Sequence, residues 1–589
     1  WNFSVGKFVF KKQLMELKRI IFPFLLLVCM AGGPRTQAAC ENFQRIAFIA
    51  DAHIQDVVGH PELVRSMEVQ VQSTRLFNEN YFALIAALED VVKRGISLVV
   101  LPGDLTDDGQ LVNQEAVKRI LDEYACRHGV SFFVTTGNHD PLRPFGTECT
   151  RHDFLTPTGQ TTALTSDVSL GGKGMVVDTL LRSAGYREEM ACYARFGYFP
   201  QSAYYYWESP FCSYTYDTYD YQRALAESPI DKRCYLLCDS LVANDASYLV
   251  EPVKGLWLLA IDGSVYLPDG VKNGKQQYQG AGSGYNNVLK HKPFLLPWVR
   301  NVAEEAKHRN KTLVAFCHYP LVDFNRGASP LIEAYWGKNK FDLSRVPADS
   351  IAEAFWEAGI RIHVAGHMHV NNTGVKVGKD GSRLYNIQVP SIATCVPAYK
   401  ILTIKDTNTF EVSTVLLDSV PGFNSLFPLY EKEYAYTLSS GKKPIWSKEA
   451  LNSKSYAEFC DWQFKDLVRT RFVPNDLPPV LLDSLSQEDE RAQLLSDLVL
   501  DLYRLRYAGS LARKCIPNKR LEQYQEMFEE IKRQSVSSEF VKQMDALERI
   551  FQRFLEVELD TDVIHCLCLP EKVVHLSPRK SDGIWIESD

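Results

Sequence analysis

Short apolar runs alternate with amphipathic stretches from residue 45 onward. The runs at 46–50, 98–101 and 132–135 have the length and composition of buried strands, whereas 77–93 and 114–124 carry apolar residues at helical spacing. Further strands are predicted at 256–261, 313–316, 360–365, 384–389 and 400–404, and a further helix at 350–357. The pattern therefore predicts an α/β core with packed sheets.

The alternation breaks at 141–250, which we interpret as a long insertion rich in cysteine and aromatic residues. Its closely spaced cysteines are candidates for disulfides in an exported chain: Cys192, Cys212, Cys234 and Cys238. The aromatic run from Tyr204 to Tyr221 predicts either the core of a small disulfide-linked subdomain or a stacking surface that covers a substrate cleft.

Strand signals fade after about residue 422. Helical spacing then recurs at 487–508, 519–534 and 538–557. We therefore expect a principal domain over 40–422, followed by a helical C-terminal region over 423–589. Its amphipathic segments are suited either to packing within the chain or to docking a partner.

The N-terminus has the pattern of an export signal. Lys18 and Arg19 precede an apolar run over 20–31, and small residues at Ala38 and Ala39 stand just ahead of Cys40. We assign 1–39 to this signal, and residues 1–14, ahead of Met15, can be upstream sequence that is not translated. Cleavage near Ala38 would release a periplasmic, cell-envelope or secreted protein, whereas modification of Cys40 would anchor it to a membrane by a lipid.

Composition narrows the class of partner. The 589 residues are 46% hydrophobic and 23% charged, which is typical of a globular protein. The formal net charge of −7 gives no polybasic signature, so we expect no nucleic acid partner and favour a small-molecule or lipid substrate. Nothing in the sequence indicates the oligomeric state.

Five short motifs follow predicted strands. They are Asp51-Ala-His53, Gly103-Asp104, Gly137-Asn138-His139-Asp140, His318 within Cys-His-Tyr-Pro, and Gly366-His367-Met368-His369. Because open α/β sheets place ligand sites beyond the carboxyl ends of their strands, we expect the five motifs to meet in one cleft.

The motif residues are suited to binding metal ions. Residues two apart in extended backbone project to the same side, so Asp51 with His53, and His367 with His369, can each present two ligands to one place. The glycines ahead of the ligand positions allow a sharp turn or a close approach. A donor set of carboxylate, carboxamide and imidazole groups without thiolates suits a site for manganese, iron or zinc ions. It fits less well with a structural zinc site, which would be built from cysteines.

The motif set resembles that of the calcineurin-like metallophosphoesterase superfamily, over about residues 45–415. The resemblance implies a four-layer α/β-β/α sandwich with two metal ions in the cleft. It assigns the ligands as follows: Asp51, His53 and His369 to the first metal, Asn138, His318 and His367 to the second, and Asp104 as the bridge between them.

The resemblance also implies hydrolysis of a phosphoric ester by a water held between the two ions. His139 would be the general acid for the leaving oxygen, and Asp140 would orient that imidazole. Cyclic-nucleotide phosphodiesterases, nucleotidases and lipid phosphoesterases share these motifs, so we expect an exported phosphodiesterase or phosphomonoesterase. The alternative is a metal-dependent binding or scaffold protein whose C-terminal helices dock a partner.

Several nearby residues have a simpler interpretation. Asp107 and Asp108 are interpreted as caps of the helix that follows them. His363 lies inside a predicted strand and is assigned a structural role, and Cys317 is interpreted as a buried thiol. A purple acid phosphatase would carry a tyrosine shortly after the motif aspartate, where this chain reads Leu105-Thr106.

Overall fold

The computed structural model describes residues 44–556 except 173, 239–240, 273, 514 and 534–537, together with the backbone of 561–565. The export signal expected over 1–39 and the anchor site expected at Cys40 lie outside the described residues. Within the described part of the chain, no helix combines the length and apolar character needed to cross a membrane.

The first of two large sheets has six strands in the order β20-β19-β18-β1-β2-β3. One half of it is parallel and consists of β1 (Gln44–Phe48), β2 (Leu98–Leu101) and the edge strand β3 (Ser131–Val134). β18 (Ala398–Ile404) and β19 (Thr409–Leu416) extend the sheet in antiparallel orientation. Most residues of the parallel strands are buried, as expected for strands covered on both faces.

The second sheet has seven strands in the order β16-β17-β15-β14-β11-β10-β7. Four neighbouring strands run parallel: β11 (Leu256–Ile261), β14 (Thr312–Cys317), β15 (Ile362–Ala365) and β17 (Arg383–Gln388). Antiparallel strands complete the two edges: β16 (Asn372–Val377) on one side, and β10 (Tyr248–Val253) with β7 (Tyr206–Glu208) on the other.

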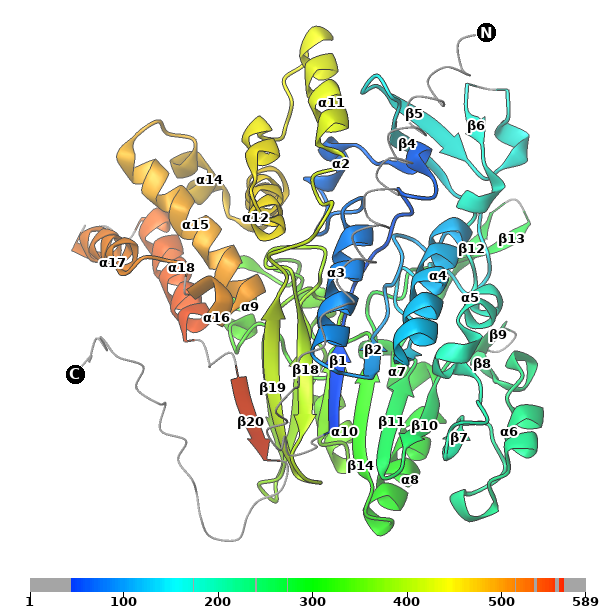
Figure 1. Ribbon diagram of the computed structural model, residues 1–589. Coiled ribbons are helices and arrows are strands. Elements are labelled where there is room, and N and C mark those ends of the chain that lie inside the picture. Colours follow the sequence, from blue (N-terminus) through cyan, green and yellow to red (C-terminus); the bar gives the residue numbers. More distant parts are fainter. Residues whose placement is uncertain are drawn as a thin grey trace, which may run out of the picture.

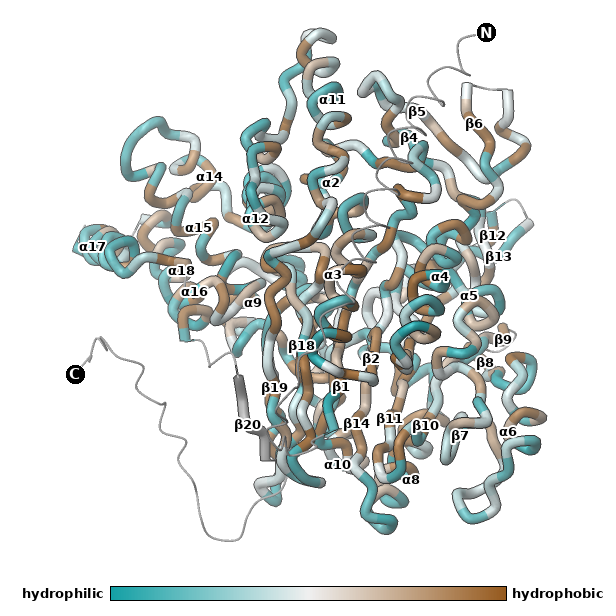
Figure 2. The backbone as a smooth tube through the Cα atoms, in the orientation of Figure 1, coloured by the Kyte–Doolittle hydropathy of each residue, from teal (hydrophilic) through white to brown (hydrophobic). Residues whose placement is uncertain are grey.

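The two sheets face each other between layers of helices (Figure 1). α3 (Asn80–Lys93) and α4 (Leu111–His128) cover the first sheet, and α8 (Leu295–His308) and α10 (Asp349–Glu357) cover the second. Buried residues from both sheets form one continuous hydrophobic core, and the strands of this core are the most hydrophobic part of the backbone trace (Figure 2). The predicted four-layer α/β sandwich is confirmed.

The insertion is joined to the main sandwich. It contains a small sheet of β4 (Thr150–Leu155), β5 (Thr161–Thr165) and β6 (Val176–Val177), and the helices α5 (Tyr186–Cys192) and α6 (Tyr221–Glu227). Its strands β7 and β10, however, belong to the second large sheet. Tyr206 of β7 stacks on Trp257 of β11, with 5.9 Å between ring centroids. The aromatic run therefore extends the main core and does not form a separate one.

The disulfides predicted in the insertion are absent, because every cysteine in the described residues is a free thiol. Cys234 and Cys238 occupy opposite ends of β8 (Cys234–Cys238). Four residues of strand separate their Cα atoms by about 13 Å, beyond the reach of a disulfide. The prediction failed because sequence proximity does not bring strand residues together in space.

Helices dominate the chain after β19. They include α11 (Phe427–Ser439), α12 (Tyr456–Leu467), α14 (Pro479–Leu485), α15 (Glu490–Ala508), α17 (Asn518–Arg533) and α18 (Glu539–Leu555). The apolar residues of α11 and of the first half of α12 belong to the first core. Those of the later helices form a second hydrophobic core that also takes in α9 (Ser329–Trp336) and Met368 of the Gly-His-Met-His motif. These helices thus pack against the loops of the sandwich.

One element of the C-terminal region is not helical. β20 (Thr561–His565) pairs antiparallel with β19 and becomes the edge strand of the first sheet. The description of 423–589 as helical is therefore incomplete, because the chain returns to the sandwich after α18 (Figure 1).

Candidate metal centre

The motif residues lie just beyond the carboxyl ends of parallel strands from both sheets. Asp51 and His53 follow β1, Asp104 follows β2, and Asn138 and His139 follow β3 in the first sheet. His318 follows β14, and His367 and His369 follow β15, in the second. Two buried groups result, each with its ligand atoms within 4.8 Å of one another: Asp51, His53 and His369, and Asp104, His318 and His367.

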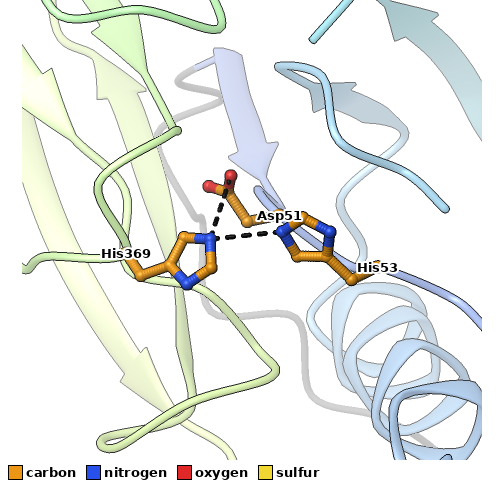
Figure 3. Close-up of side chains that lie close together, drawn as sticks. All are labelled: Asp51, His53 and His369. Carbon is orange, nitrogen blue, oxygen red and sulfur yellow. Dashed lines mark hydrogen bonds and ion pairs between the residues drawn. The ribbon is translucent and has the colours of Figure 1, made fainter. Parts of the chain in front are cut away.

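The first group joins β1 to the loop after β15 (Figure 3). The Nε2 atoms of His53 and His369 lie 3.2 Å apart, and His369 Nε2 lies 3.5 Å from Asp51 Oδ1. Ligands that bind one zinc ion at about 2.0–2.1 Å stand about 3 Å from one another. The spacing therefore fits three donors that face a common cation.

The second group has the same spacing. His318 Nε2 lies 3.2 Å from Asp104 Oδ2, 3.1 Å from His367 Nδ1 and 3.2 Å from Asn138 Oδ1. Asp104 Oδ2 also lies 3.8 Å from Nε2 of His53 in the first group. The Asp104 carboxylate thus stands between the two groups, where a bridging ligand would lie.

Backbone carbonyls fix the orientation of three imidazoles. Pro102 O lies 3.0 Å from His318 Nδ1, Thr74 O lies 3.2 Å from His369 Nδ1, and Gly282 O lies 3.2 Å from His367 Nε2. A carbonyl can only accept, so each of these nitrogens carries the proton. The opposite nitrogen of each ring therefore presents its lone pair to the candidate site.

The protonation states of the site residues also suit the binding of cations. Burial lowers the pKa of His53 and of His367 well below the ordinary value, so both rings are neutral near pH 7. Burial alone would raise the pKa of Asp104, but the neighbouring His318 and His139 hold it well below its usual range. Neutral imidazoles and an ionised carboxylate are the forms that bind metals, and this donor set suits manganese, iron or zinc.

Each motif glycine makes room for a predicted ligand. A Cβ on Gly137 would lie 2.0 Å from Asp104 Oδ1, one on Gly366 would lie 2.5 Å from Asp51 Oδ2, and one on Gly103 would lie 2.8 Å from His318 Nδ1. Such contacts are impossible for a real side chain, so the glycines permit the close approach that the sequence indicated.

The backbone of the motifs is not extended. Of the nine non-glycine residues with positive φ in the described part of the chain, five are predicted ligands: Asp51, His53, Asp104, His367 and His369. The expected extended backbone is therefore wrong for both pairs, although Asp51 and His53 do belong to one group as expected. His367 and His369 in fact belong to different groups, because the left-handed turn directs them to opposite sides of the Asp104 carboxylate.

His139 lies beside both groups without joining either. Its ring packs edge-on against His53 with 5.1 Å between centroids, and its backbone N–H donates to Asp104 Oδ1 over 2.9 Å. Its Nδ1 lies 2.6 Å from Asp108 Oδ1. This short contact indicates that Nδ1 carries a proton and donates it to the Asp108 carboxylate in a hydrogen bond. Nε2 is then left free to contact a substrate. Burial and the nearby Arg75 lower the pKa of His139 to about 4.

Asp140 does not orient His139, contrary to the prediction. Both oxygens of its buried carboxylate accept from the backbone N–H of Leu105, over 2.8 and 3.1 Å. Asp140 therefore holds the loop that carries Asp104. The imidazole contact predicted for it is made by Asp108.

Asp107 and Asp108 do not cap the following helix. α4 begins at Leu111 behind Gln110, with no side-chain cap. Asp107 instead pairs with Arg65 over 2.6 Å, with Arg75 over 3.3 Å and with Arg151 over 3.3 Å, and Arg151 also pairs with Asp108. This buried network borders His139, and nothing in the local sequence around Arg75 indicated that it would reach the site.

Two residues with a predicted structural role have one. His363 is fully buried in β15, where its ring lies 2.8 Å from Asn386 Oδ1 and 3.1 Å from the Tyr285 hydroxyl. Cys317 is a buried free thiol at the end of β14.

Known proteins provide an independent comparison. The chain is similar to a dimetal phosphatase from Danio rerio at 14% identity, covering 63% of this chain and 95% of that one, with a TM-score of 0.33. It is also similar to a purple acid phosphatase from yellow lupin, Lupinus luteus, at 10% identity, covering 63% and 51%, with a TM-score of 0.31. A third similar structure is GAP50, the anchor in the inner membrane complex of Plasmodium, at 11% identity, covering 63% and 84%, with a TM-score of 0.26.

These structural similarities are too low to support an argument, and no curated protein sequence matches the chain. The assignment depends instead on a family model, that of the calcineurin-like phosphoesterases, which matches residues 44–201. The matched segment contains the Asp-x-His, Gly-Asp and Gly-Asn-His-Asp motifs. Over residues 44–201 the chain is therefore similar to the calcineurin-like phosphoesterases.

Proposed function

We propose that this protein hydrolyses phosphoric esters with two metal ions and with His139 as the general acid. The observation that carries the proposal is the pair of buried carboxylate and imidazole groups on either side of Asp104. The family match over residues 44–201 supports the same reaction class. Asp51, His53 and His369 would hold one ion, and Asn138, His318 and His367 the other.

Bound there, the two cations would lower the pKa of a water molecule and stabilise negative charge on the phosphoryl oxygens. The protein contributes the positions of the donors. Asp104 is fixed by the backbone N–H of His139, over 2.9 Å, and His318 and His369 are oriented by backbone carbonyls. Such fixed donors need little rearrangement when charge develops, which is the main source of electrostatic catalysis.

His139 has the geometry of a proton donor to the leaving oxygen. Asp108 holds its Nδ1 at 2.6 Å, so the ring presents Nε2, and the side chain is 23% exposed and therefore accessible. The negative charge of a bound phosphate would favour the protonated ring and oppose the effect of burial on its pKa. The imidazole would thus become an acid when the substrate is in place.

The substrate range and the location of the protein belong to the proposal as well. We propose a phosphomonoester or phosphodiester that is small or lipid-linked, acted on by an exported protein. The acidic composition supports the first part, because it gives no sign of nucleic acid binding. The apolar run over 20–31 behind a basic pair supports the second.

The experiment compares p-nitrophenyl phosphate with bis-p-nitrophenyl phosphate, with and without added manganese. The full-length protein should hydrolyse at least one of the two esters, and this hydrolysis should require added metal. His139→Ala should keep two ions per chain yet lower turnover about 10²–10⁴-fold, whereas the exposed His308→Ala serves as a control that should match the parent. Undiminished turnover in His139→Ala would remove His139 from the mechanism, and no metal-dependent turnover of either ester would contradict the proposal.

A further inference from the structure

A loop without helix or strand crosses beside the metal centre. We call residues 71–78 the Arg75 loop; it connects α2 (Met67–Gln70) to the segment before α3. The carbonyl of Thr74 accepts from His369 Nδ1 over 3.2 Å, and the next residue is Arg75. Arg75 Nη2 lies 3.3 Å from Asp107 Oδ1 and 3.3 Å from His139 Nδ1. The loop thus brings a cation to the residue proposed as the general acid.

The guanidinium of Arg75 has donors to spare. Among the described residues, the hydrogen bonds that it donates are all made by Nη2, to the backbone carbonyl and the carboxylate of Asp107, while Nε is buried without an acceptor. Arg65, in the same network, binds Asp153 through Nε and Asp107 through Nη1. Buried donors nearly always have partners, so the unused donors of Arg75 indicate an anion that is not part of the chain.

The chemistry of that anion follows from the position of the donors. A guanidinium presents N–H groups in a plane that matches the oxygens of a phosphoryl group. Nη2 of Arg75 lies 3.3 Å from Nδ1 of His139, whose ring packs against His53 and whose backbone N–H binds Asp104, so a phosphate bound between the candidate metals would be within reach of the same side chain. The Arg75 side chain is 12% exposed and so is not sealed into the core.

The C-terminal helices hold the Arg75 loop in place. Gln463 of α12 is fully buried, and its Nε2 donates to Gln70 O and to Ser73 O, both over 2.8 Å. Arg471 donates to Gln72 O over 2.9 Å. The Gln70 carbonyl also accepts from the backbone N–H of Ser73 over 3.1 Å. The other hydrogen bonds to these carbonyls come from side chains that lie almost 400 residues further along the chain.

A second contact from the same region fixes both ends of the loop. Tyr430 of α11 accepts from Gln70 Nε2 over 3.2 Å and from Asn78 Nδ2 over 2.9 Å. Gln70 Oε1 in turn accepts from the backbone N–H of Phe77 over 2.8 Å, which closes the loop on itself. Between the two ends, Gln463 binds the carbonyl of Ser73, and the backbone N–H of Leu76 donates to Ala393 O over 2.8 Å on the far side of Arg75.

We propose that Arg75 binds a non-bridging oxygen of the substrate phosphoryl group and that Gln463 is the positioning residue for it. This inference rests on the proposed phosphoesterase function and gives the C-terminal helices a role within the chain, because they hold a substrate-binding loop over the metal centre. A phosphoryl oxygen completes the hydrogen bonding of Arg75, and Gln463 acts only through the loop.

Binding of inorganic phosphate to the full-length, manganese-loaded protein tests the role of Arg75. Arg75→Gln should keep two ions per chain but weaken phosphate binding, measured by calorimetry, and raise KM for the hydrolysed ester, each about 10-fold to 100-fold. Arg195→Gln is the matched control, because Arg195 is 59% exposed and pairs with Asp122. Loss of the metals, or phosphate affinity equal to that of the parent, would overturn the role.

A double-variant cycle tests Gln463. Gln463→Leu should weaken phosphate binding about 3-fold to 10-fold, and it should add nothing further in the Arg75→Gln background, because both changes remove one interaction. Asp501→Asn controls for general weakening of the C-terminal helices, since Asp501 is buried in contact with Arg520 and Tyr524 and does not touch the loop. That variant should lose thermal stability without losing phosphate affinity.

The two proposals fail in different ways. The positioning role would be refuted if the losses of phosphate affinity in Gln463→Leu and Arg75→Gln were additive in the double variant. It would also be refuted if Gln463→Leu and Asp501→Asn lost phosphate affinity equally. A parent protein that binds phosphate through Arg75 but hydrolyses neither ester would refute the proposed function alone. A parent that hydrolyses an ester, with phosphate binding and KM unchanged in Arg75→Gln, would refute the inference alone.

Discussion

The strongest test of the shared carboxylate is a single methyl group on Gly137. A Cβ at this position would stand 2.0 Å from Asp104 Oδ1 and 2.5 Å from the Asp104 backbone nitrogen. Because carbon does not approach such atoms within 3.0 Å, Gly137→Ala must displace the carboxylate or its loop by about 1 Å, and a shift of this size costs about 10²-fold in rate. Overpacking costs a further 1–3 kcal/mol or so of folding stability.

The affinity for metal is the direct readout, because Asp104 lies 3.2 Å from His318 in one group and 3.8 Å from His53 in the other. Titration of the metal-free protein with manganese should show both sites weakened in Gly137→Ala. Gly280→Ala is the control, since its nearest neighbour would be Arg143 at 3.7 Å and its φ is not positive. If Gly137→Ala binds two ions with the affinity of the parent, Asp104 is not the bridge.

Three other predictions address the surroundings of the site. Asp108→Asn should retain both metals but lose about 10-fold to 100-fold in turnover, because the imidazole loses its anchor; turnover equal to that of the parent would exclude this contact from catalysis. Burial raises the pKa of Glu433 from 4.5 to about 7, so the folded chain keeps a proton that the unfolded chain loses, and stability falls as pH rises between these values. In Glu433→Gln, the fall in unfolding free energy between about pH 5 and pH 8, measured by denaturant unfolding, should be smaller by on the order of 1–3 kcal/mol. An unchanged fall would contradict the prediction. Lys292→Met removes the cation that pairs with the buried Asp245 and Asp262, so it should cost about 3–5 kcal/mol of unfolding free energy. The exposed Lys290→Met is the control and should cost less than about 0.5 kcal/mol. Equal losses in the two variants would refute the reasoning.

The sandwich could be predicted from sequence because its signals are local. Apolar runs such as 98–101 and 256–261 coincide with β2 and β11 residue for residue, since a buried parallel strand must be hydrophobic on both faces. The motifs at the ends of these runs likewise determined which side chains would meet. The roles of the ligands remain predictions that metal analysis can test.

The contacts around the site could not be predicted, because they depend on distant segments. Asp140 follows His139 directly in sequence, yet its carboxylate binds Leu105, whereas Asp108, which lies 31 positions from His139, reaches its Nδ1. Arg75 stands in a loop that is held by distant residues, among them Gln463 and Ala393. No pattern within either segment contains that information.

The interlocking of the motifs explains how the strained backbone persists. A left-handed conformation costs a non-glycine residue about 1–2 kcal/mol, so the positive φ of Asp51 and His53 must be offset by their surroundings. His53 N–H donates to Asp104 O over 3.0 Å, and His367 N–H donates to the Asp51 carboxylate over 3.0 Å.

The strained turns are therefore stabilised by hydrogen bonds to other motifs as well as by local ones. Gly366 N–H, for example, donates to His318 O over 2.9 Å and so ties the β15 turn to the β14 turn. The donors consequently stand close together before any ion binds, which reduces the rearrangement that binding would require. A substitution at one motif should for the same reason disturb the others, so the candidate site is expected to respond to mutation as a unit.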